Sequence, residues 1–467
     1  MSGAAPVTRS LAVVGGGVAG LATAWYAAAD GWDVTVYEAA PAVGGKLRAG
    51  EVGGVTVDLG AESMLTTRPE GVDLLDALGL TAARRSPATT AARIRAGGAA
   101  HPLPARTLLG IPTDLDALRT SGVLSAGAVD AVEAEPSLPP MAPLVEDVSV
   151  GSVVRARIGD EVADRLVEPL LGGVYSGRAD ELSLRAAVPA LAARLGEGGS
   201  LVDAARALSG ARPPSAGPVF TSLDGGLAGL PQALARSGRF AVRTGVTVRA
   251  LRRTPAGFAL ECGAVPTAEQ VTADAVVIAA PAAKAARLLR GVAPAAGTEL
   301  AGIESANLAI ITFAFRGVAL PPGSGLLVAA GERLATKAVT LTSQKWGLAG
   351  DVTVLRASVG RAGDNTALRF DDADLISLVH RELRPLLGVD AAPVDALVTR
   401  WGGGLPQYAV GHVSRVARIR SAVAAVPGLA VCGAAYDGVG IPACIASARA
   451  AVARLGAADQ GRGQSGT

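Results

Sequence analysis

The chain has 467 residues, a formal net charge of +2 and three cysteines. This length exceeds what one hydrophobic core supports and predicts two or three domains. The balanced charge, with no basic run longer than two residues, argues against nucleic acid as a partner. Three cysteines give neither a disulfide framework nor a metal-ligand ladder, so we expect no metal site and a reducing, cytoplasmic setting. The sequence also lacks a signal-peptide pattern and a long uncharged apolar run, so we predict no integral membrane segment.

The most informative segment lies near the N-terminus. An apolar strand pattern runs into Gly15-Gly16-Gly17, a helix pattern follows, and a second strand pattern ends at Glu38. Gly15 allows a tight turn, Gly17 lets the backbone approach a pyrophosphate at the helix N-terminus, and Gly20 lets helix and strand pack closely. Glu38 is placed to accept hydrogen bonds from a ribose 2′-hydroxyl. We therefore predict an α/β, Rossmann-type dinucleotide-binding unit.

A second glycine pair follows this acid at once. Gly44 and Gly45 again allow the backbone to lie close to a ligand, and Lys46 and Arg48 add positive charge beside phosphates. A Gly-Ala-Glu-Ser run at 60–63 extends the pattern. These additions point to a larger ligand-binding segment than the first glycine motif alone provides.

The extended pattern resembles the FAD-binding segments of the amine oxidase and protoporphyrinogen oxidase superfamily, in which a Rossmann unit and a C-terminal segment hold the flavin. Residues 429–449 have the strand, glycine loop and helix start of that second segment. The resemblance implies FAD as the cofactor, with the last helix aiming its positive end at the flavin pyrimidine ring. It also implies that the backbone of Val248 meets adenine; Trp401 either lines the flavin or is a core aromatic. The residues expected to contact FAD are Gly15, Gly16, Gly17, Val18, Ala19, Gly20, Glu38, Ala39, Gly44, Gly45, Lys46, Arg48, Gly60, Ala61, Glu62, Ser63, Val248, Trp401, Gly433, Val439, Gly440 and Ile441.

The chain between the two flavin segments shows further elements. Residues 91–104 predict a β-hairpin with a Gly-Gly turn, and a helix is expected over 149–171, started by a serine and interrupted by Gly159. A stretch rich in Pro, Gly and Ser at 210–217 predicts a linker, and a further helix is expected near 371–388. The expected division is a discontinuous FAD-binding domain (1–85, 211–295 and 401–457), an inserted α+β substrate domain (86–105 and 296–400), a helical subdomain (106–210) and a disordered tail (458–467).

Several longer motifs resemble protoporphyrinogen and coproporphyrinogen oxidases rather than amine oxidases. These motifs begin at Glu168 (Glu-Pro-Leu-Leu-Gly-Gly-Val-Tyr-Ser-Gly), at Glu181 (Glu-Leu-Ser-Leu-Arg), at Leu405 (Leu-Pro-Gln-Tyr-Ala-Val-Gly-His) and at Tyr436 (Tyr-Asp-Gly-Val-Gly-Ile). The similarity runs nearly from end to end. It implies an FAD-dependent oxidase of haem biosynthesis that removes six electrons from a porphyrinogen and reduces oxygen to hydrogen peroxide.

The same resemblance assigns substrate-binding residues. Arg93 would bind a propionate, although an exposed hairpin arginine is the alternative. Gly173 matches the glycine whose carbonyl faces pyrrole N–H groups, and Leu170 matches a wall residue before it. In eukaryotic members a phenylalanine lies against the ring where Ser324 stands here, while Leu327 is retained. This departure predicts a wider or more polar pocket.

No protein acid or base is assigned, because the flavin carries the redox chemistry. His412 is expected to be structural rather than a base near the flavin. The region 106–147, apolar and membrane-facing in eukaryotic relatives, carries seven acids here, which predicts a soluble protein.

Two substrates remain open. The leading hypothesis is coproporphyrinogen III, whose four propionates suit a polar pocket with Arg95 as a second cation, and the alternative is protoporphyrinogen IX. An amine oxidase or carotenoid desaturase is a more distant alternative, with Lys284, Lys337 or Lys345 as a flavin-facing lysine. A degenerate flavin-binding module would show damaged motifs, and none is seen. The expected partners are the porphyrinogen, molecular oxygen and a transient contact with the next haem-pathway enzyme.

Overall fold

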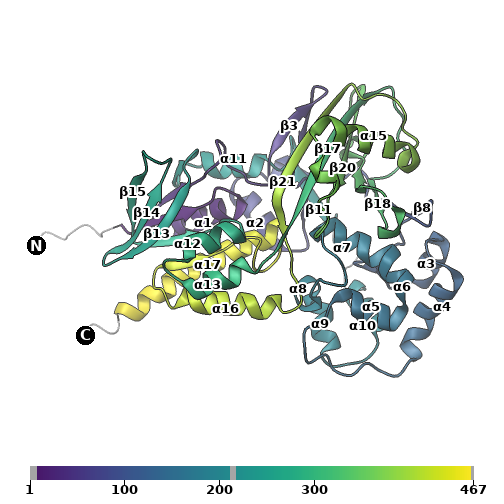
Figure 1. Ribbon diagram of the computed structural model, residues 1–467, viewed down its shortest axis with the longest axis horizontal. Coiled ribbons are helices and arrows are strands. Elements are labelled where there is room, and N and C mark those ends of the chain that lie inside the picture. The colour runs from purple at the N-terminus through teal and green to yellow at the C-terminus, as the bar shows by residue number, and fades with distance from the viewer. Residues whose placement is uncertain (1–7, 211–216, 464–467) are drawn as a thin grey trace, which may run out of the picture.

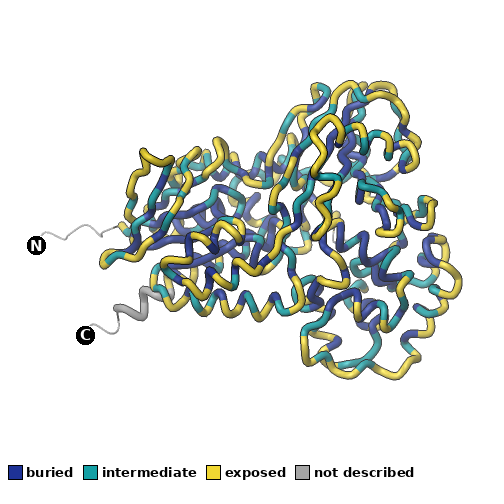
Figure 2. Tube along the Cα trace, viewed as in Figure 1, coloured by how far each residue is buried: buried dark blue, intermediate teal, exposed yellow. Residues whose placement is uncertain are grey.

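The computed structural model describes residues 8–210 and 217–463, and the side chains of these up to residue 456. Within them the chain forms a mixed α/β fold, as predicted, with three parts (Figure 1). A nucleotide-binding domain lies at one end of the long axis, and a second sheet and a helical subdomain lie at the other. Buried segments run through the middle of each part, with exposed loops around them (Figure 2).

A five-stranded parallel sheet, here called the nucleotide sheet, forms the centre of the nucleotide-binding domain in the order β12-β2-β1-β16-β22. Its strands are β1 (Ser10–Val14), β2 (Asp33–Tyr37), β12 (Ala241–Arg243), β16 (Ala275–Ile278) and β22 (Leu429–Val431). All four residues of β16 are buried, as expected for a parallel strand covered on both faces. Since the strands come from three distant stretches of chain, the domain is discontinuous.

Helices cover both faces of the nucleotide sheet. On one face α1 (Val18–Ala29) packs against α17 (Ile441–Gly463), with Ala22 and Ala448 in one apolar cluster. On the other face lie α12 (Ala282–Leu289), α13 (Pro294–Ala301) and α16 (His412–Ala424). An antiparallel sheet of β13 (Val248–Thr254), β14 (Gly257–Cys262) and β15 (Glu269–Ala273) adds Phe258 and Leu260 to that second cluster. The many alanines allow these helices to approach one another closely.

A seven-stranded mixed sheet, here called the substrate sheet, has the order β21-β17-β20-β19-β18-β7-β8. Its strands are β7 (Ala92–Ala96), β8 (Ala99–Pro102), β17 (Ser305–Arg316), β18 (Gly325–Val328), β19 (Thr336–Thr340), β20 (Val352–Val359) and β21 (Asp395–Pro406). The hairpin of β7 and β8 turns at Gly97-Gly98, as predicted. The helix α15 (Asp372–Leu387) covers one face, where Leu375 and Val379 pack against Phe313.

The helical subdomain covers part of the opposite face. Its elements are β9 (Thr107–Leu108), β10 (Ile111–Pro112), α3 (Leu115–Ser121), α4 (Ala126–Ala134), η2 (Glu135–Ser137), α5 (Val150–Ile158), α6 (Asp160–Val162), η3 (Ala163–Val167), α7 (Glu168–Tyr175), α8 (Leu184–Ala187), α9 (Pro189–Leu195) and α10 (Leu201–Ser209). The predicted helix start and interruption are confirmed: Ser149 Oγ accepts from Ser152 N–H, and α5 ends at Gly159 with φ +90°. Glu135, one of the seven acids of this region, is fully buried and binds Arg157 and the first backbone N–H groups of α10.

Smaller elements connect these parts. They are β3 (Ala49–Val52), β4 (Val55–Asp58), β5 (Met64–Leu65), α2 (Pro69–Ala77), η1 (Thr81–Ala83), β6 (Arg84–Arg85), β11 (Phe220–Leu223), α11 (Gly229–Arg236), η5 (Ala330–Glu332), α14 (Thr342–Trp346) and η6 (Ala367–Arg369). None of the described helices is long and apolar enough to cross a membrane.

Three segments differ from the expected division or lie outside it. The strand β21 stays in the substrate sheet as far as Pro406, because a register shift opposite Ala306 and Leu308 accommodates its glycines. The backbone of 458–463 continues α17 where a disordered tail was predicted, since the alanines before it favour helix; 464–467 lie outside the described residues. Most of the predicted linker, 211–216, also lies outside them.

Candidate active site

A long cavity of about 850 Å³ opens at the carboxyl ends of the nucleotide-sheet strands and extends toward the helical subdomain. Its lining comes from the glycine loop after β1, the end of β2, the loop before α12, β17, β21, the start of α17 and the exposed part of α7. Ligands of open α/β sheets bind at this edge of the strands. The cavity therefore joins the predicted nucleotide site to the predicted substrate region.

The glycines of the first loop have different structural roles. Gly15 has φ +111°, a conformation that a side chain would strain. A Cβ on Gly20 would lie 1.9 Å from Gly15 O, so Gly20 is required for packing of α1 on β1. A Cβ on Gly17 would meet no protein atom within 4 Å, yet Gly17 lines the cavity. The open space beside Gly17 is what close approach of a pyrophosphate requires.

Glu38 is held in position at the end of β2. Its carboxylate accepts hydrogen bonds from Gly16 N–H at 2.6 Å and from Ala40 N–H at 2.7 Å. Glu38 and Ala39 both line the cavity. Each carboxylate oxygen retains a lone pair, so the fixed side chain can accept the ribose hydroxyls expected from the sequence.

The second glycine pair closes over the first loop. Gly44 N–H donates to Gly16 O at 2.8 Å, and a Cβ on Gly45 would lie 3.2 Å from Gly17 Cα. Lys46 also lines the cavity, and burial lowers the pKa of its ammonium. This lysine therefore supplies a partly desolvated cation to the ligand. Arg48 instead stacks over Trp401 at 5.8 Å, and Trp401 lines the cavity.

The residues of the 60–63 segment have two structural roles. Gly60 and Ala61 line the cavity. Glu62 instead pairs with Lys345 Nζ at 2.5 Å and with Arg356 Nη1 at 2.7 Å. Burial disfavours its charge, but the two cations outweigh burial and lower its pKa. Glu62 thus connects the segment after β4 to α14 and β20. Neither Glu62 nor Ser63 is among the described residues that line the cavity.

The C-terminal segment completes the cavity. Gly433, Val439 and Ile441 line it, and α17 begins at Ile441. Gly440 does not line the cavity, but its carbonyl accepts the first helical hydrogen bond, from Cys444 N–H, at 3.0 Å. The positive end of a long helix therefore faces the cavity, as predicted, and would favour negative charge on a ligand there.

The sequence reasoning missed part of the lining. Val248 lines the cavity, as do Lys284 and Arg287 of α12. Leu308 and Ile310 of β17 form an apolar wall. The period of β17 could have identified Leu308 and Ile310 as one face of a strand, but no local motif marks the two α12 cations as cavity residues.

Of the five predicted substrate residues, only Gly173 is among the described residues that line the cavity. Gly173 lines the cavity, Leu327 Cδ2 lies 3.7 Å from the position of a Cβ on Gly173, and Leu170 lies on the same helix. Arg93 donates to Ala100 O at 3.1 Å, and Ser324 Oγ donates to Ala91 O at 3.0 Å. Neither Arg93 nor Ser324 is among the described residues that line the cavity.

Strand alternation explains the position of Arg93. Successive side chains of β7 point to opposite faces, so Arg93 and Arg95 share a face that excludes Ile94. Arg95 binds Glu332 at 2.9 Å and the carbonyl of Pro385 in α15 at 2.7 Å. Ile94 packs instead with the helical subdomain. The two arginines therefore face the α15 side of the substrate sheet, away from α7.

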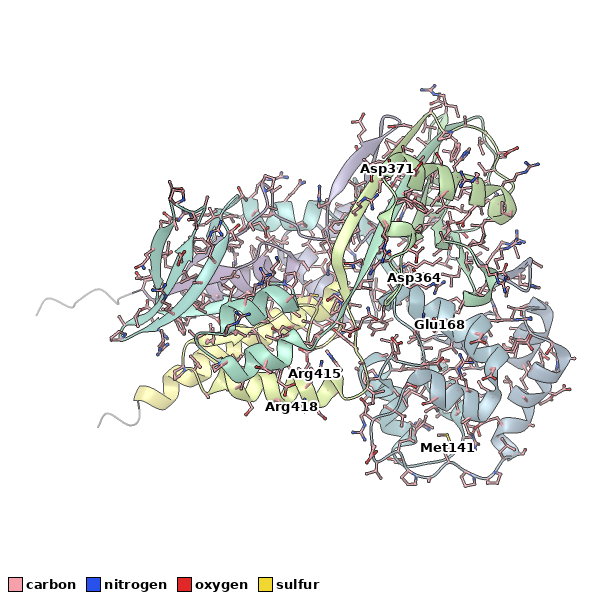
Figure 3. The ribbon with its side chains drawn as sticks, in the orientation of Figure 1. Met141, Glu168, Asp364, Asp371, Arg415 and Arg418 are labelled. Atoms are coloured by element: carbon pink, nitrogen blue, oxygen red, sulfur yellow. The ribbon has the colours of Figure 1, made fainter. Side chains whose placement is uncertain are left out.

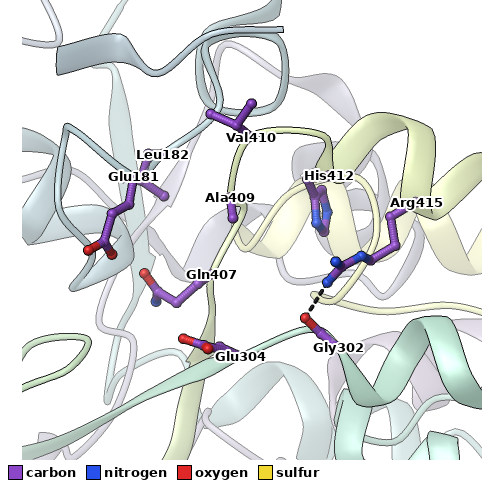
Figure 4. Close-up of a pocket in the computed structure, with 9 residues that line it drawn as sticks. All are labelled: Glu181, Leu182, Gly302, Glu304, Gln407, Ala409, Val410, His412 and Arg415. Atoms are coloured by element: carbon purple, nitrogen blue, oxygen red, sulfur yellow. Dashed lines mark hydrogen bonds between the residues drawn. The ribbon is translucent and has the colours of Figure 1, made fainter. Parts of the chain in front are cut away.

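A second, smaller hollow of about 420 Å³ lies between the helical subdomain and the nucleotide-binding domain (Figure 4). His412 lines it, stacks on Tyr408 at 4.0 Å and bonds through Nε2 to Tyr436 O at 3.2 Å. Burial lowers the pKa of this imidazole. His412 does not line the large cavity, which agrees with its expected structural role.

The chain is similar to known proteins over most of its length. The family model of flavin-containing amine oxidoreductases matches residues 18–456. A coproporphyrinogen III oxidase of Mycobacterium tuberculosis is 40% identical over 95% of this chain and 96% of its own length. The Bacillus subtilis protein of the same name is 31% identical over 95% and 97% of the two chains.

Two solved structures resemble this chain over nearly their whole length. An Exiguobacterium protein described provisionally as a protoporphyrinogen oxidase superposes with a TM-score of 0.85 and 33% identity, covering 96% of this chain and 98% of the other. A putrescine oxidase superposes at 0.67 with 17% identity, covering 97% and 99% of the two chains, which shows a shared fold.

Proposed function

This chain belongs to the family of flavin-containing amine oxidoreductases, and we propose that it oxidises coproporphyrinogen III to coproporphyrin III. The observation that carries this proposal is the 40% identity, over nearly the full length, to relatives named coproporphyrinogen III oxidases. Molecular oxygen accepts the electrons and protons removed from the substrate, so the six-electron oxidation reduces three O2 to three hydrogen peroxide molecules. The protein acts in the cytoplasm and passes its product to the next haem-pathway enzyme by a transient contact.

FAD fits the cavity. The open space at Gly17, the fixed carboxylate of Glu38 and the start of α17 suit, in that order, a pyrophosphate, a ribose and an electron-rich ring. Lys46 also lines the cavity, as does Val248, where we expect the adenine to bind. When bound, FAD supplies the hydride acceptor for each of the oxidation steps.

The protein residues position the substrate and exclude water. Leu308 and Ile310 provide an apolar wall next to Trp401, and Gly173 brings the backbone of α7 to the cavity without a side chain. We propose that Leu170, Gly173 and Leu327 lie against the macrocycle. Arg93 faces the α15 side of the substrate sheet, away from α7, so we assign the substrate carboxylates to other cations.

The amine oxidase alternative lacks support from the lysines. Lys345 is paired with Glu62. Lys284 lines the cavity from α12, which packs against β13 of the nucleotide-binding domain, and Lys337 is not among the described residues that line it. Protoporphyrinogen IX is the second candidate substrate, because the similar Exiguobacterium structure is described as a protoporphyrinogen oxidase.

Parallel aerobic assays of both porphyrinogens test the proposal. Following porphyrin fluorescence at low salt, we expect a higher kcat/KM for coproporphyrinogen III, and a smaller preference as salt screens its extra charges. Equal or faster turnover of protoporphyrinogen IX would reassign the substrate within the family. A protein that binds FAD and oxidises neither compound would overturn the proposed function.

A further inference from the structure

Two cations lie between α7 and the substrate sheet without an acidic partner. Lys337 is 5% exposed, and its Nζ donates to Ser176 Oγ. Arg361, just after β20, is partly buried and donates through Nη2 to Val328 O at 3.3 Å. No carboxylate of the described residues forms an ion pair with either one. Buried lysines and arginines are rare unless they are paired, so this pair needs an explanation.

A β-bulge aims Lys337 at α7. The register of β19 on β20 pairs Thr336 with Val359 and Ala338 with Ser358, so Lys337 is the extra residue. A bulge of this kind turns a side chain away from its regular alternation. The neighbouring strand places Leu327 opposite Ala338, on the face that packs against the helical subdomain. Lys337 thus reaches the α7 side of the sheet, the side from which Arg93 and Arg95 are absent.

The two cations have unused hydrogen-bonding capacity. An ammonium has three donors and a guanidinium has five. Each side chain makes one hydrogen bond within the described part of the chain, Lys337 to Ser176 and Arg361 to Val328. The remaining donors are available to a ligand with several acceptor atoms.

The acids nearest to Arg361 bind main-chain N–H groups rather than the guanidinium. Glu168 lies near Arg361, but its carboxylate accepts Ala179 N–H at 2.5 Å. Asp364 accepts Thr366 N–H at 2.9 Å. Figure 3 shows both acids at the boundary of the helical subdomain and the substrate sheet. Arg178, which is exposed, adds a third cation near Arg361.

The opposite face of the substrate sheet adds one more acid. Glu382 of α15 accepts the N–H groups of Ala335 and Thr336, each at 2.8 Å. Its carboxylate is thus bound to the main chain there. These three acids equal the three cations in number, but within the described part of the chain none of them forms an ion pair with Lys337 or Arg361.

Neither Lys337 nor Arg361 is among the described residues that line the cavity, but both contact α7, which reaches it. A Cβ on Gly172 would lie 3.2 Å from Arg361 Nη1, and the next residue, Gly173, lines the cavity. Ser176 ends α7 in the left-handed conformation, with φ +52°, and presents its hydroxyl to Lys337. Three residues of helix span about 4.5 Å, so Lys337 lies roughly one turn beyond Gly173.

We propose that Lys337 and Arg361 form a subsite for a propionate carboxylate of the tetrapyrrole, replacing the arginine expected on β7. This inference rests on the proposed function. The ammonium and the planar guanidinium both donate to the carboxylate, and such charge-assisted bonds are stronger than neutral ones. In the free enzyme, burial, with a smaller contribution from Arg361, lowers the pKa of Lys337 to about 7. A bound carboxylate favours the charged amine, so binding draws a proton from solution.

The test uses the holoenzyme and coproporphyrin III, which binds without turnover. Fluorescence titrations compare the wild type, Lys337→Met, Arg361→Met and the control Arg381→Gln, which removes one exposed charge on α15. We expect Kd to rise about 10-fold to 100-fold for the two subsite variants, the loss of a charged hydrogen bond, and to stay unchanged for the control. The tetramethyl ester of coproporphyrin III should not distinguish the subsite variants from the wild type.

A second measurement needs no variant. In weakly buffered solution the wild type should take up a fraction of one proton on binding coproporphyrin III, larger at pH 8 than at pH 6.5. Absence of this uptake, or a Kd for Lys337→Met equal to that of Arg381→Gln at full flavin content, would overturn the subsite. A wild type that oxidises neither porphyrinogen would instead overturn the proposed function, so the two failures are distinguishable.

Discussion

Gly17 and Gly20 lie three residues apart in one motif, yet the structure predicts opposite consequences for their substitution. Gly17 has an extended backbone (φ −74°, ψ 177°) and open space around it, so Gly17→Val should fold normally but purify with little flavin. In Gly20→Ala the new Cβ would lie 1.9 Å from Gly15 O, so this variant should lose stability itself. Flavin absorbance and thermal unfolding separate the two cases. A stable, flavin-free Gly20→Ala would contradict this distinction.

The pKa of Lys337 makes the stability of the fold depend on pH. The pKa is about 7 in the folded protein and roughly 10.4 in an unfolded chain. Between these values the unfolded chain binds more protons, so the contribution of Lys337 to the free energy of unfolding rises with pH. Below pH 7 the buried charge costs its full desolvation.

We therefore expect Lys337→Met to stabilise the protein at pH 6 and to do so less at pH 9. Urea unfolding of the apoprotein at both pH values measures this difference, with Arg381→Gln again as the control. A stabilisation that is the same at pH 6 and pH 9 would show that the lysine stays charged throughout.

At the scale of elements, Glu62 joins the loop after β4 to α14 and β20 of the substrate sheet. Removing its charge leaves Lys345 and Arg356 without their acidic partner, although Arg356 keeps its bond to Gly60 O, and breaking a buried pair costs about 3–5 kcal/mol. The exposed pair Arg316–Asp351 is a matched control, since surface pairs contribute about 0–1 kcal/mol. Urea unfolding of Glu62→Gln and Asp351→Asn should show this contrast. Equal effects would mean that water already screens the Glu62 pair.

Local signals made several elements predictable. Gly97-Gly98 defined the β7–β8 hairpin, and Ser149 and Gly159 defined the two ends of α5. The bulge at Lys337 was not predictable, because it depends on how β19 aligns with β20. The parallel pairing of β18 with β7 joins residues more than 200 positions apart, and no local pattern encodes it.

The nucleotide end of the site was predictable from local sequence motifs, whereas the substrate end was not. The glycine motifs and Glu38 are local and gave the nucleotide end of the cavity directly. The substrate end depends on strand parity. In Ala-Arg-Ile-Arg-Ala at 92–96, the alternation itself places Arg93 and Arg95 opposite the buried Ile94. That parity places Arg93 on the face opposite α7, whereas the residues that face α7 from other strands depend on the fold.

For the whole molecule, the cavity lies where three distant stretches of chain and the helical subdomain meet. Bound FAD should therefore contact all of them and stabilise the folded state. A ligand that binds only the folded state adds RT ln(1 + [L]/Kd), about 4 kcal/mol at a thousandfold excess over Kd. We expect removal of FAD to lower Tm by several degrees and added FAD to restore it.

FMN serves as the control for this prediction, because it lacks the adenosine half that we expect to reach Val248 and Glu38, which both line the cavity. FMN can bind near the start of α17, but it is too short to contact the end of β2 at the same time. FMN should therefore restore only part of the lost Tm at concentrations at which FAD restores all of it. Full recovery with FMN would mean that the flavin ring alone stabilises the fold and that the glycine loop after β1 contributes affinity without holding the stretches together.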